Sequence, residues 1–276
     1  MPSVTNYRLP AKQRQVRQRG KGVTNVRNHP DQVKHRRVLG VKRWIGIIFL
    51  VPLALITFVT MLKFFGRIAS RHELWRSEEV IFFGAGTLAW TAAYLAGWRP
   101  VVSYVFGHEL SHLIVAKLFG GKILDFHFSA AGGYVETDKS NTAISLAPYL
   151  IPLYSIVAMV LFGIAGLFMD LDSLHVVHLG RVAISAKAVW LLYLLIGFTW
   201  AFHLTFTITT IRAEQGDLKR NGEFFSTLLI FIINVLLVVG LVLIASPNPD
   251  FSFAEVLRCW FGVATSIFAW MGSFLG

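Results

Sequence analysis

The chain has 276 residues, of which 55% are hydrophobic and only 15% are charged. A soluble domain carries about a quarter charged residues, so this composition excludes an ordinary soluble globular protein and indicates a membrane protein. The net charge is +11, and residues 1–43 account for all of it, with twelve Lys or Arg against one acid, Asp31. The basic charge therefore belongs to one polar segment and does not indicate a nucleic-acid-binding fold.

Residues 1–43 are expected to form a disordered, basic, cytoplasmic arm. Positive charge collects on the cytoplasmic side of membrane proteins and binds anionic lipid headgroups. RNA, the ribosome or a regulatory partner is the alternative, but the arm has no RNA-binding motif, and we expect no specific nucleic acid. A polar stretch of about 40 residues is too long to begin a cleaved signal peptide, so the first span should remain as an anchor. Cys259 is the only cysteine, which excludes an intrachain disulfide.

Residues 44–276 are expected to form one polytopic membrane domain. A helix needs about 20 apolar residues to cross a bilayer, and several runs reach or approach that length. The fold predicted is therefore all-α, with six or seven transmembrane helices. The expected spans are 44–66, 79–97, 101–119, 143–168, 188–211 and 224–245, with 255–275 as the seventh.

One connection differs from the other loops. Ile123 to Phe128 partly alternates between apolar and polar residues, and Gly132-Gly133 precedes a second short run, Tyr134 to Thr137. Alternation around a glycine pair is typical of a β-hairpin. A short β-hairpin is therefore expected directly after the third span, with an irregular loop as the alternative.

The third span contains an H-E-x-x-H motif, His108-Glu109-Leu110-Ser111-His112. Positions i and i+4 share one face of a helix, so both imidazoles can bind one metal ion while Glu109 reaches the water that the metal activates. Neutral imidazole suits zinc. The pattern predicts His108 and His112 as zinc ligands and Glu109 as the catalytic acid and base.

The depth of the motif strengthens this interpretation. His108 and His112 each lie seven residues from an end of the span, about 10 Å at 1.5 Å per residue, and therefore near the middle of the membrane. An ionisable side chain at that depth costs at least roughly 2.5–3.5 kcal/mol. A bound metal would offset this cost, whereas the alternative is three polar side chains that merely hydrogen-bond to neighbouring helices.

Residues 107–112, followed by Gly120-Gly121 and the expected hairpin, resemble the site-2 protease family over about residues 100–240. The resemblance implies an intramembrane zinc metalloprotease that cleaves membrane-protein substrates in or near their transmembrane segments. It also implies an aspartate as the third ligand, in a Leu-Asp-Gly setting that this chain lacks. The nearest match is Gln215-Gly216-Asp217-Leu218, so Asp217 is the expected third ligand.

Other residues compete with Asp217 for that role. His203 lies inside an apolar span, where a histidine is unusual, and Glu214 and Glu223 flank the same loop. The alternative for Asp217 itself is an ordinary solvated loop acid. His175 and His178 are interpreted as surface residues.

Several features suggest how substrate would reach the site. Pro148 and Pro152 interrupt the fourth span and produce either a water path or a simple kink. The hairpin could hold an unwound substrate by adding a strand. Asn234 could contact the substrate or an oxyanion, as the resemblance implies, or hydrogen-bond to another helix.

Three alternatives to site-2 proteolysis remain open. A prenyl-protein or quality-control metallopeptidase would use a glutamate as third ligand, a structural zinc scaffold would use four ligands, and a silent relative would only bind membrane partners. The topology also contains a conflict. With the arm inside, alternation of six spans puts Asp217 outside, whereas the site-2 family opens its site toward the cytoplasm.

Overall fold

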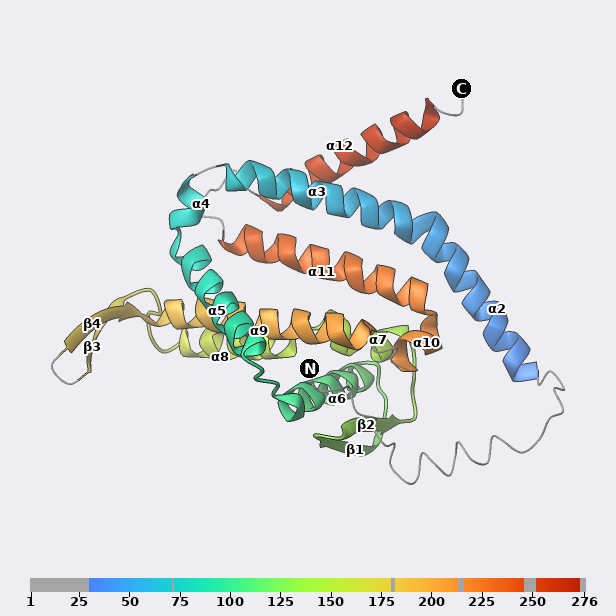
Figure 1. The fold of residues 1–276 in the computed structure, drawn as a ribbon, viewed down its shortest axis with the longest axis horizontal. Helices are drawn as coiled ribbons and strands as arrows, with labels where there is room; N and C mark the ends of the chain where they lie inside the picture. Colours follow the sequence, from blue (N-terminus) through green and yellow to red (C-terminus); the bar gives the residue numbers. More distant parts are fainter. Residues whose placement is uncertain (1–29, 71, 180–181, 213–215, 246–251, 274–276) are drawn as a thin grey trace.

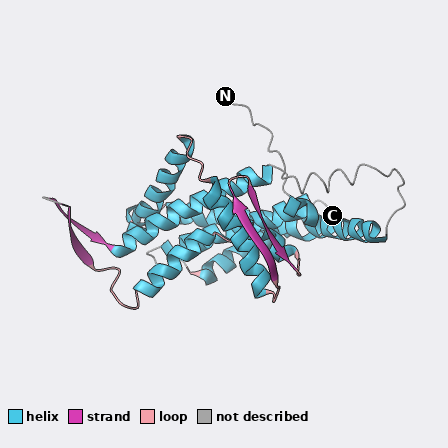
Figure 2. Ribbon diagram, turned by 90° about the horizontal axis from the view of Figure 1, so that it is seen from below, coloured by secondary structure: helices cyan, strands magenta, loops and turns pink. Residues whose placement is uncertain are grey.

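The computed structural model describes residues 30–273, except 71, 180–181, 213–215 and 246–251. It is mostly helical, with two small antiparallel sheets (Figures 1 and 2). The elements before the first hairpin are α2 (Pro30–Ile45), the π-helical turn η1 (Gly46–Leu50), α3 (Val51–Ala69), α4 (His72–Arg76), α5 (Glu78–Leu95) and α6 (Val101–Leu118). They are followed by β1 (Ile123–Ser129), β2 (Gly132–Thr137), α7 (Thr142–Leu150), α8 (Leu153–Ala165), β3 (Leu174–Leu179) and β4 (Val182–Lys187). The chain continues through α9 (Ala188–Arg212), α10 (Gly216–Asn221), α11 (Glu223–Ala245) and α12 (Phe253–Gly272).

Three of the described helical segments are long and apolar enough to cross a membrane. They are Arg36–Ala69, Ala188–Ile211 and Glu223–Leu243, and the bent pair α7–α8 would make a fourth. α5, α6 and α12 occupy the remaining ranges in which the sequence predicted spans. The count of six or seven spans stays a prediction.

The described part of the basic arm is helical. The sequence predicted a disordered arm through residue 43, whereas α2 begins at Pro30 and continues through η1 into α3. Residues 1–29 lie outside the described residues. α2 and η1 both pack against the start of α11, and a Cβ on Gly46 of η1 would meet the Phe224 ring at 3.0 Å.

α5 and α9 form the closest helix pair. A Cβ on Gly86 would lie 2.0 Å from the carbonyl oxygen of Leu194, and one on Gly197 would lie 2.0 Å from that of Phe83. Small residues of this kind let two backbones approach closely. Trp90, only 1% exposed, packs beside this contact against Phe198, Phe202 and Phe206 on α9. The pair forms the centre of one layer, and α3, α11 and α12 form another (Figure 1).

The predicted fourth span is broken into α7 and α8, whose axes differ by 72°. Asn141 caps α7 by accepting a hydrogen bond from the Ile144 amide. Ile151 is extended at φ −111° and ψ 109°, as expected before a proline, and Pro152 has no amide hydrogen to continue the helix. The break follows from Pro152, since Pro148 lies within α7.

The two antiparallel strand pairs lie in different surroundings (Figure 2). β1 and β2 pair from Ile123↔Thr137 to Ser129↔Gly132, with a register shift between Ile123 and Asp125, and pack against α6. β3 and β4 pair from Leu174↔Lys187 to Leu179↔Val182 and project from one end of the molecule. The first pair is the one that neighbours the H-E-x-x-H helix.

Candidate metal centre

Two histidines and one aspartate converge at the junction of α6 and α10. The Nε2 atoms of His108 and His112 lie 3.7 and 3.5 Å from Oδ2 of Asp217. Each residue offers one ligand atom, and these three atoms lie within 4.8 Å of one another. His108 and His112 are one helical turn apart on α6, with ring centroids 5.0 Å apart. The three residues could hold a metal ion.

Asp217 is carried by the short helix α10, which is fixed by its neighbours. The next residue, Leu218, is 2% exposed and packs with Leu146 and Tyr149 of α7 and Ile230 of α11. Ser226 donates a hydrogen bond to the Leu218 carbonyl. Packing of the apolar residue beside it thus directs the Asp217 carboxylate toward α6.

The charge state of Asp217 also suits a ligand. Burial raises the pKa of its carboxyl, but the facing imidazoles of His108 and His112 lower it further, so the net shift is below the ordinary value. The carboxylate is therefore ionised at neutral pH, as metal binding requires.

The outer ring nitrogens of both histidines have partners. His112 Nδ1 lies 2.7 Å from the carbonyl oxygen of Ile144. A carbonyl only accepts hydrogen bonds, so Nδ1 carries a proton, and Nε2 is the ring nitrogen that faces Asp217. His108 Nδ1 lies 3.1 Å from the Tyr104 hydroxyl, which is 2.6 Å from Oγ1 of Thr210 on α9. Such partners orient metal-binding imidazoles.

Glu109 lies under the first hairpin. It is 8% exposed, and a Cβ on Gly133 would come within 2.6 Å of its Cγ and 2.9 Å of Val105 Cγ1. Only glycine allows β2 to approach α6 this closely. The strand pair therefore covers the carboxylate that follows His108.

A lysine from α2 reaches the helix that carries Asp217. Lys42 Nζ donates to Asn221 Oδ1 at 2.6 Å and to Thr142 Oγ1 at 3.0 Å. Asn221 in turn donates to the Asp217 carbonyl at 3.3 Å, and Thr142 donates to Asn221 at 3.0 Å. α2, α7 and α10 thus meet in one hydrogen-bonded cluster behind Asp217.

No family model, curated protein or solved structure matches this chain. The site is therefore supported by its geometry alone.

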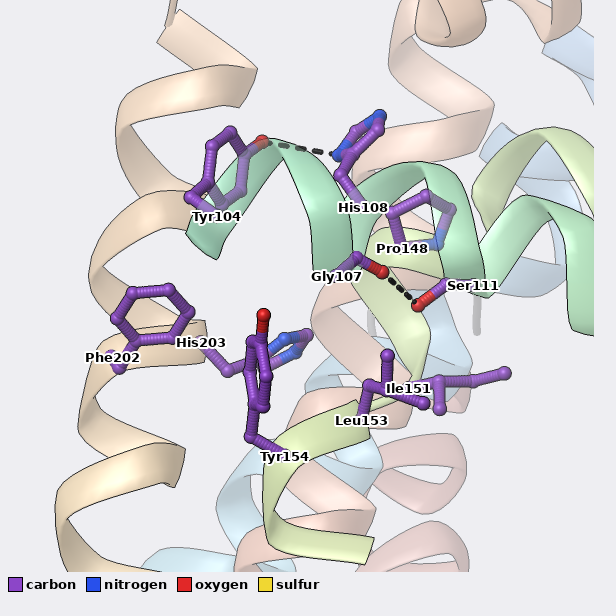
Figure 3. Close-up of a pocket in the computed structure, with 10 residues that line it drawn as sticks. All are labelled: Tyr104, Gly107, His108, Ser111, Pro148, Ile151, Leu153, Tyr154, Phe202 and His203. Atoms are coloured by element: carbon purple, nitrogen blue, oxygen red, sulfur yellow. Dashed lines mark hydrogen bonds between the residues drawn. The ribbon is translucent and has the colours of Figure 1, made fainter. Parts of the chain in front are cut away.

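His203 does not join the three ligands. It lies with Tyr104, His108 and Tyr154 around a small cavity of about 20 Å³ between α6, α8 and α9 (Figure 3). Such a volume holds about one water molecule. The buried Nε2 of His203 has no hydrogen-bond partner among the described residues.

Gly107 makes room for the side chain of Tyr154. A Cβ there would lie 2.8 Å from Tyr154 Cε2, and the Tyr154 hydroxyl donates to the Ser103 carbonyl at 2.5 Å. The neighbour of Gly107 is therefore the Tyr154 ring of α8. The glycine lets α8 close on α6.

Asn234 makes the interhelical contact that was the alternative to a substrate role. Its amide nitrogen donates to the carbonyls of Tyr149 on α7 and Ile230 on α11, at 3.1 and 2.9 Å. A side-chain amide has two N–H donors, so neither remains for an oxyanion in this arrangement. Asn234 instead joins α11 to the end of α7.

The other candidate ligands lie elsewhere. Glu223 is at the start of α11, 3.9 Å from Lys219, and Glu214 lies outside the described residues. His175, on β3, is exposed and lies 2.9 Å from the Ser173 hydroxyl. The side chain of His178 lies outside the described residues.

Sequence reasoning missed three residues that contact or support the candidate ligands: Tyr104, Tyr149 and Lys42. Tyr104 lies one turn before His108, a spacing that could have identified it. The Tyr149 ring is 5.4 Å from the His108 ring and is 1% exposed, but only the packing of α7 places it there. Lys42 resembled any other charge in the basic arm.

Proposed function

We propose that this protein is a zinc-dependent endopeptidase that hydrolyses peptide bonds in or near transmembrane segments of membrane-protein substrates. The observation that carries the proposal is the convergence of His108 and His112 with Asp217, beside a buried Glu109. Three protein ligands are the number that a catalytic zinc takes, with water at the fourth position.

The donor set and spacing fit zinc. Two imidazole nitrogens and one carboxylate oxygen are ligands of tetrahedral zinc, at bond lengths of about 2.0–2.2 Å. Ligand atoms at the corners of such a tetrahedron are about 3.4 Å apart. The 3.5 and 3.7 Å gaps between the histidines and Asp217 are close to that length and longer than a hydrogen bond.

Zinc, when bound, lowers the pKa of water toward about 7 and polarises a carbonyl. In the proposed reaction, Glu109 accepts the proton of the attacking water and passes it to the leaving amine. Tyr104 and the Ile144 carbonyl hold the imidazoles in the required orientation. The strand pair β1–β2 limits the access of water around Glu109.

The membrane-length helices support an intramembrane substrate. We propose a multi-pass protein of six or seven spans, with the basic N-terminus cytoplasmic and on anionic lipid headgroups. Beside Glu109, β1–β2 offers backbone to an unwound substrate segment. A helical substrate must unwind there, because the turns of a helix shield its peptide bonds.

Two structural details favour this proposal over its rivals. Asp217 faces the histidine pair, whereas the prenyl-protein and quality-control classes use a glutamate. Among the residues that the structure describes, the group contains three candidate ligands, whereas a structural zinc takes four.

Replacement of Glu109 by Gln tests the proposal. Glu109→Gln should retain zinc in the purified full chain but lose at least about a hundredfold in cleavage of a model transmembrane substrate, the low end for loss of a general base. Glu223→Gln is the matched control and should cleave as wild type. Cleavage by Glu109→Gln at the wild-type rate would refute the role of Glu109 as acid and base. A wild-type protein that contains no zinc would refute the proposal of a zinc enzyme.

A further inference from the structure

A larger cavity lies apart from the metal centre, among α3, α4, α5, α8, α9 and α11. Its volume is about 420 Å³, and its walls include Trp75, Glu79, Gly84, Ile196, Trp200 and Val238. Its lining includes neither Glu109 nor any of the three candidate ligands. The proposed proteolysis therefore leaves this cavity without a use.

The size of the cavity discriminates among occupants. Small-molecule sites measure about 300–1,000 Å³ and are mostly apolar, with a few polar groups. A membrane-spanning helix with its side chains is about 10 Å wide and about 30 Å long, so a whole substrate helix is several times larger than this cavity. The volume lies within the range of small-molecule sites and suits a narrow, flexible apolar group such as an acyl chain.

The cavity has a polar end near α4 and is lined by apolar side chains along the rest of its length. Along α9, its lining extends from Leu192 to Trp200, about 12 Å at 1.5 Å per residue. At the α4 end, the lining includes Trp75, Glu79 and Tyr193, and the Tyr193 hydroxyl lies 3.5 Å from Glu79 Oε1. Trp and Tyr gather where a membrane meets water. This orientation matches a lipid with its chain in the cavity and its headgroup at the α4 end.

The polar end carries acidic groups. Among the described residues, Glu79 has one hydrogen-bond partner, the Tyr193 hydroxyl at a long 3.5 Å. Lys187 is already shared by Glu78 at 2.8 Å and Asp172 at 3.1 Å. Two carboxylates thus share one ammonium group, and Glu79 has no cationic partner among the described residues. An anionic headgroup would be repelled here, whereas an ammonium headgroup would complete the pairing of Glu79.

We propose that this cavity binds one acyl chain of an amine-bearing phospholipid of the phosphatidylethanolamine type, with the ammonium group at Glu79. Apolar walls give water few hydrogen-bond partners, and lipid fills the cavity without that cost. The inference depends on membrane placement of α9 and α11, but not on zinc or proteolysis.

Lipid retention tests the proposal. The full chain is purified in detergent from membranes that contain phosphatidylethanolamine and phosphatidylglycerol, and bound lipid is quantified by mass spectrometry. A Cβ on Gly84 meets nothing within 4 Å, so Gly84→Phe should fill the cavity. It should reduce retained phosphatidylethanolamine at least tenfold from about one per chain. Gly163→Phe, also in open space but on α8 outside the cavity lining, should not.

Two further measurements keep the test independent of whether Gly84→Phe folds. Phosphatidylethanolamine with a photoreactive acyl chain should label wild-type residues 79–84 or 192–200. In Glu79→Gln, the preference for phosphatidylethanolamine over phosphatidylglycerol should be lost. Equal retention of both lipids by wild type, labelling centred on Gly163, or wild-type retention by Gly84→Phe would overturn the proposal. Zinc content of these variants reports on the metal centre separately.

Discussion

Lys42 should control metal affinity without touching the metal. Its ammonium group donates two hydrogen bonds, to Asn221 and Thr142, and Asn221 holds the backbone of Asp217. Hydrogen bonds to charged groups contribute about 1.5–3 kcal/mol each. In Lys42→Met both are lost, and α10 gains freedom to move the third ligand away from the histidines.

The expected loss of zinc affinity in Lys42→Met is partial. Loss of an outer-shell partner typically lowers metal affinity by about 10–100-fold. Thr142 still donates to Asn221 at 3.0 Å, so the cluster should loosen rather than collapse. We therefore expect Lys42→Met to bind zinc 10- to 100-fold more weakly, and Lys42→Arg to recover part of the loss because it keeps charge and donors.

Competition with a chromophoric chelator on purified full chain measures this affinity. Lys63→Met is the matched control, because Lys63 is exposed on the adjoining helix α3 and is not among the cluster's partners. It should compete as wild type does. Chelator curves for Lys42→Met that superimpose on wild type would refute the link between α2 and Asp217, as would an equal loss in Lys63→Met.

Three further predictions concern the packing and the ligands. Gly86→Ala should destabilise the protein by about 1–3 kcal/mol, because its Cβ would lie 2.0 Å from a carbonyl; thermal unfolding should show Gly84→Ala unaffected. Gly133→Ala should displace β2 from the general base and slow cleavage by about a hundredfold while zinc content stays at the wild-type level. Asp217→Ala should lose zinc and Glu223→Ala should retain it; metal analysis with the opposite result would assign the third ligand to a glutamate.

Sequence periodicity and length locate the helices well but not their interruptions. The runs at 188–211 and 224–245 match α9 and α11 closely, because each is apolar and has charged residues at its ends. The run at 143–168 was predicted as one span, since hydropathy does not record direction. The 72° bend at Pro152 depends on the missing amide hydrogen, which the sequence marks without indicating the angle.

The candidate site divides in the same way. His108 and His112 could be paired from sequence because their contact is local to one helix. The convergence of Asp217 depends on α10, whose position is set by Leu218 in a pocket formed by two other helices. Asn234 illustrates the limit, since its donors are taken by carbonyls of α7 and α11 that no sequence pattern brings together.

The glycine contact between α5 and α9 determines which parts of the molecule can move. Each helix has a glycine at which the backbone of the other approaches closely, so we expect the two helices to move together. The Tyr104 hydroxyl, which contacts His108, is hydrogen-bonded to Thr210 on α9. Asp217, in contrast, is carried by α10, which precedes α11. For the proposed protease, we therefore expect an opening that admits substrate to displace α10 and α11 from the two histidines, which would couple substrate entry to assembly of the proposed ligand set.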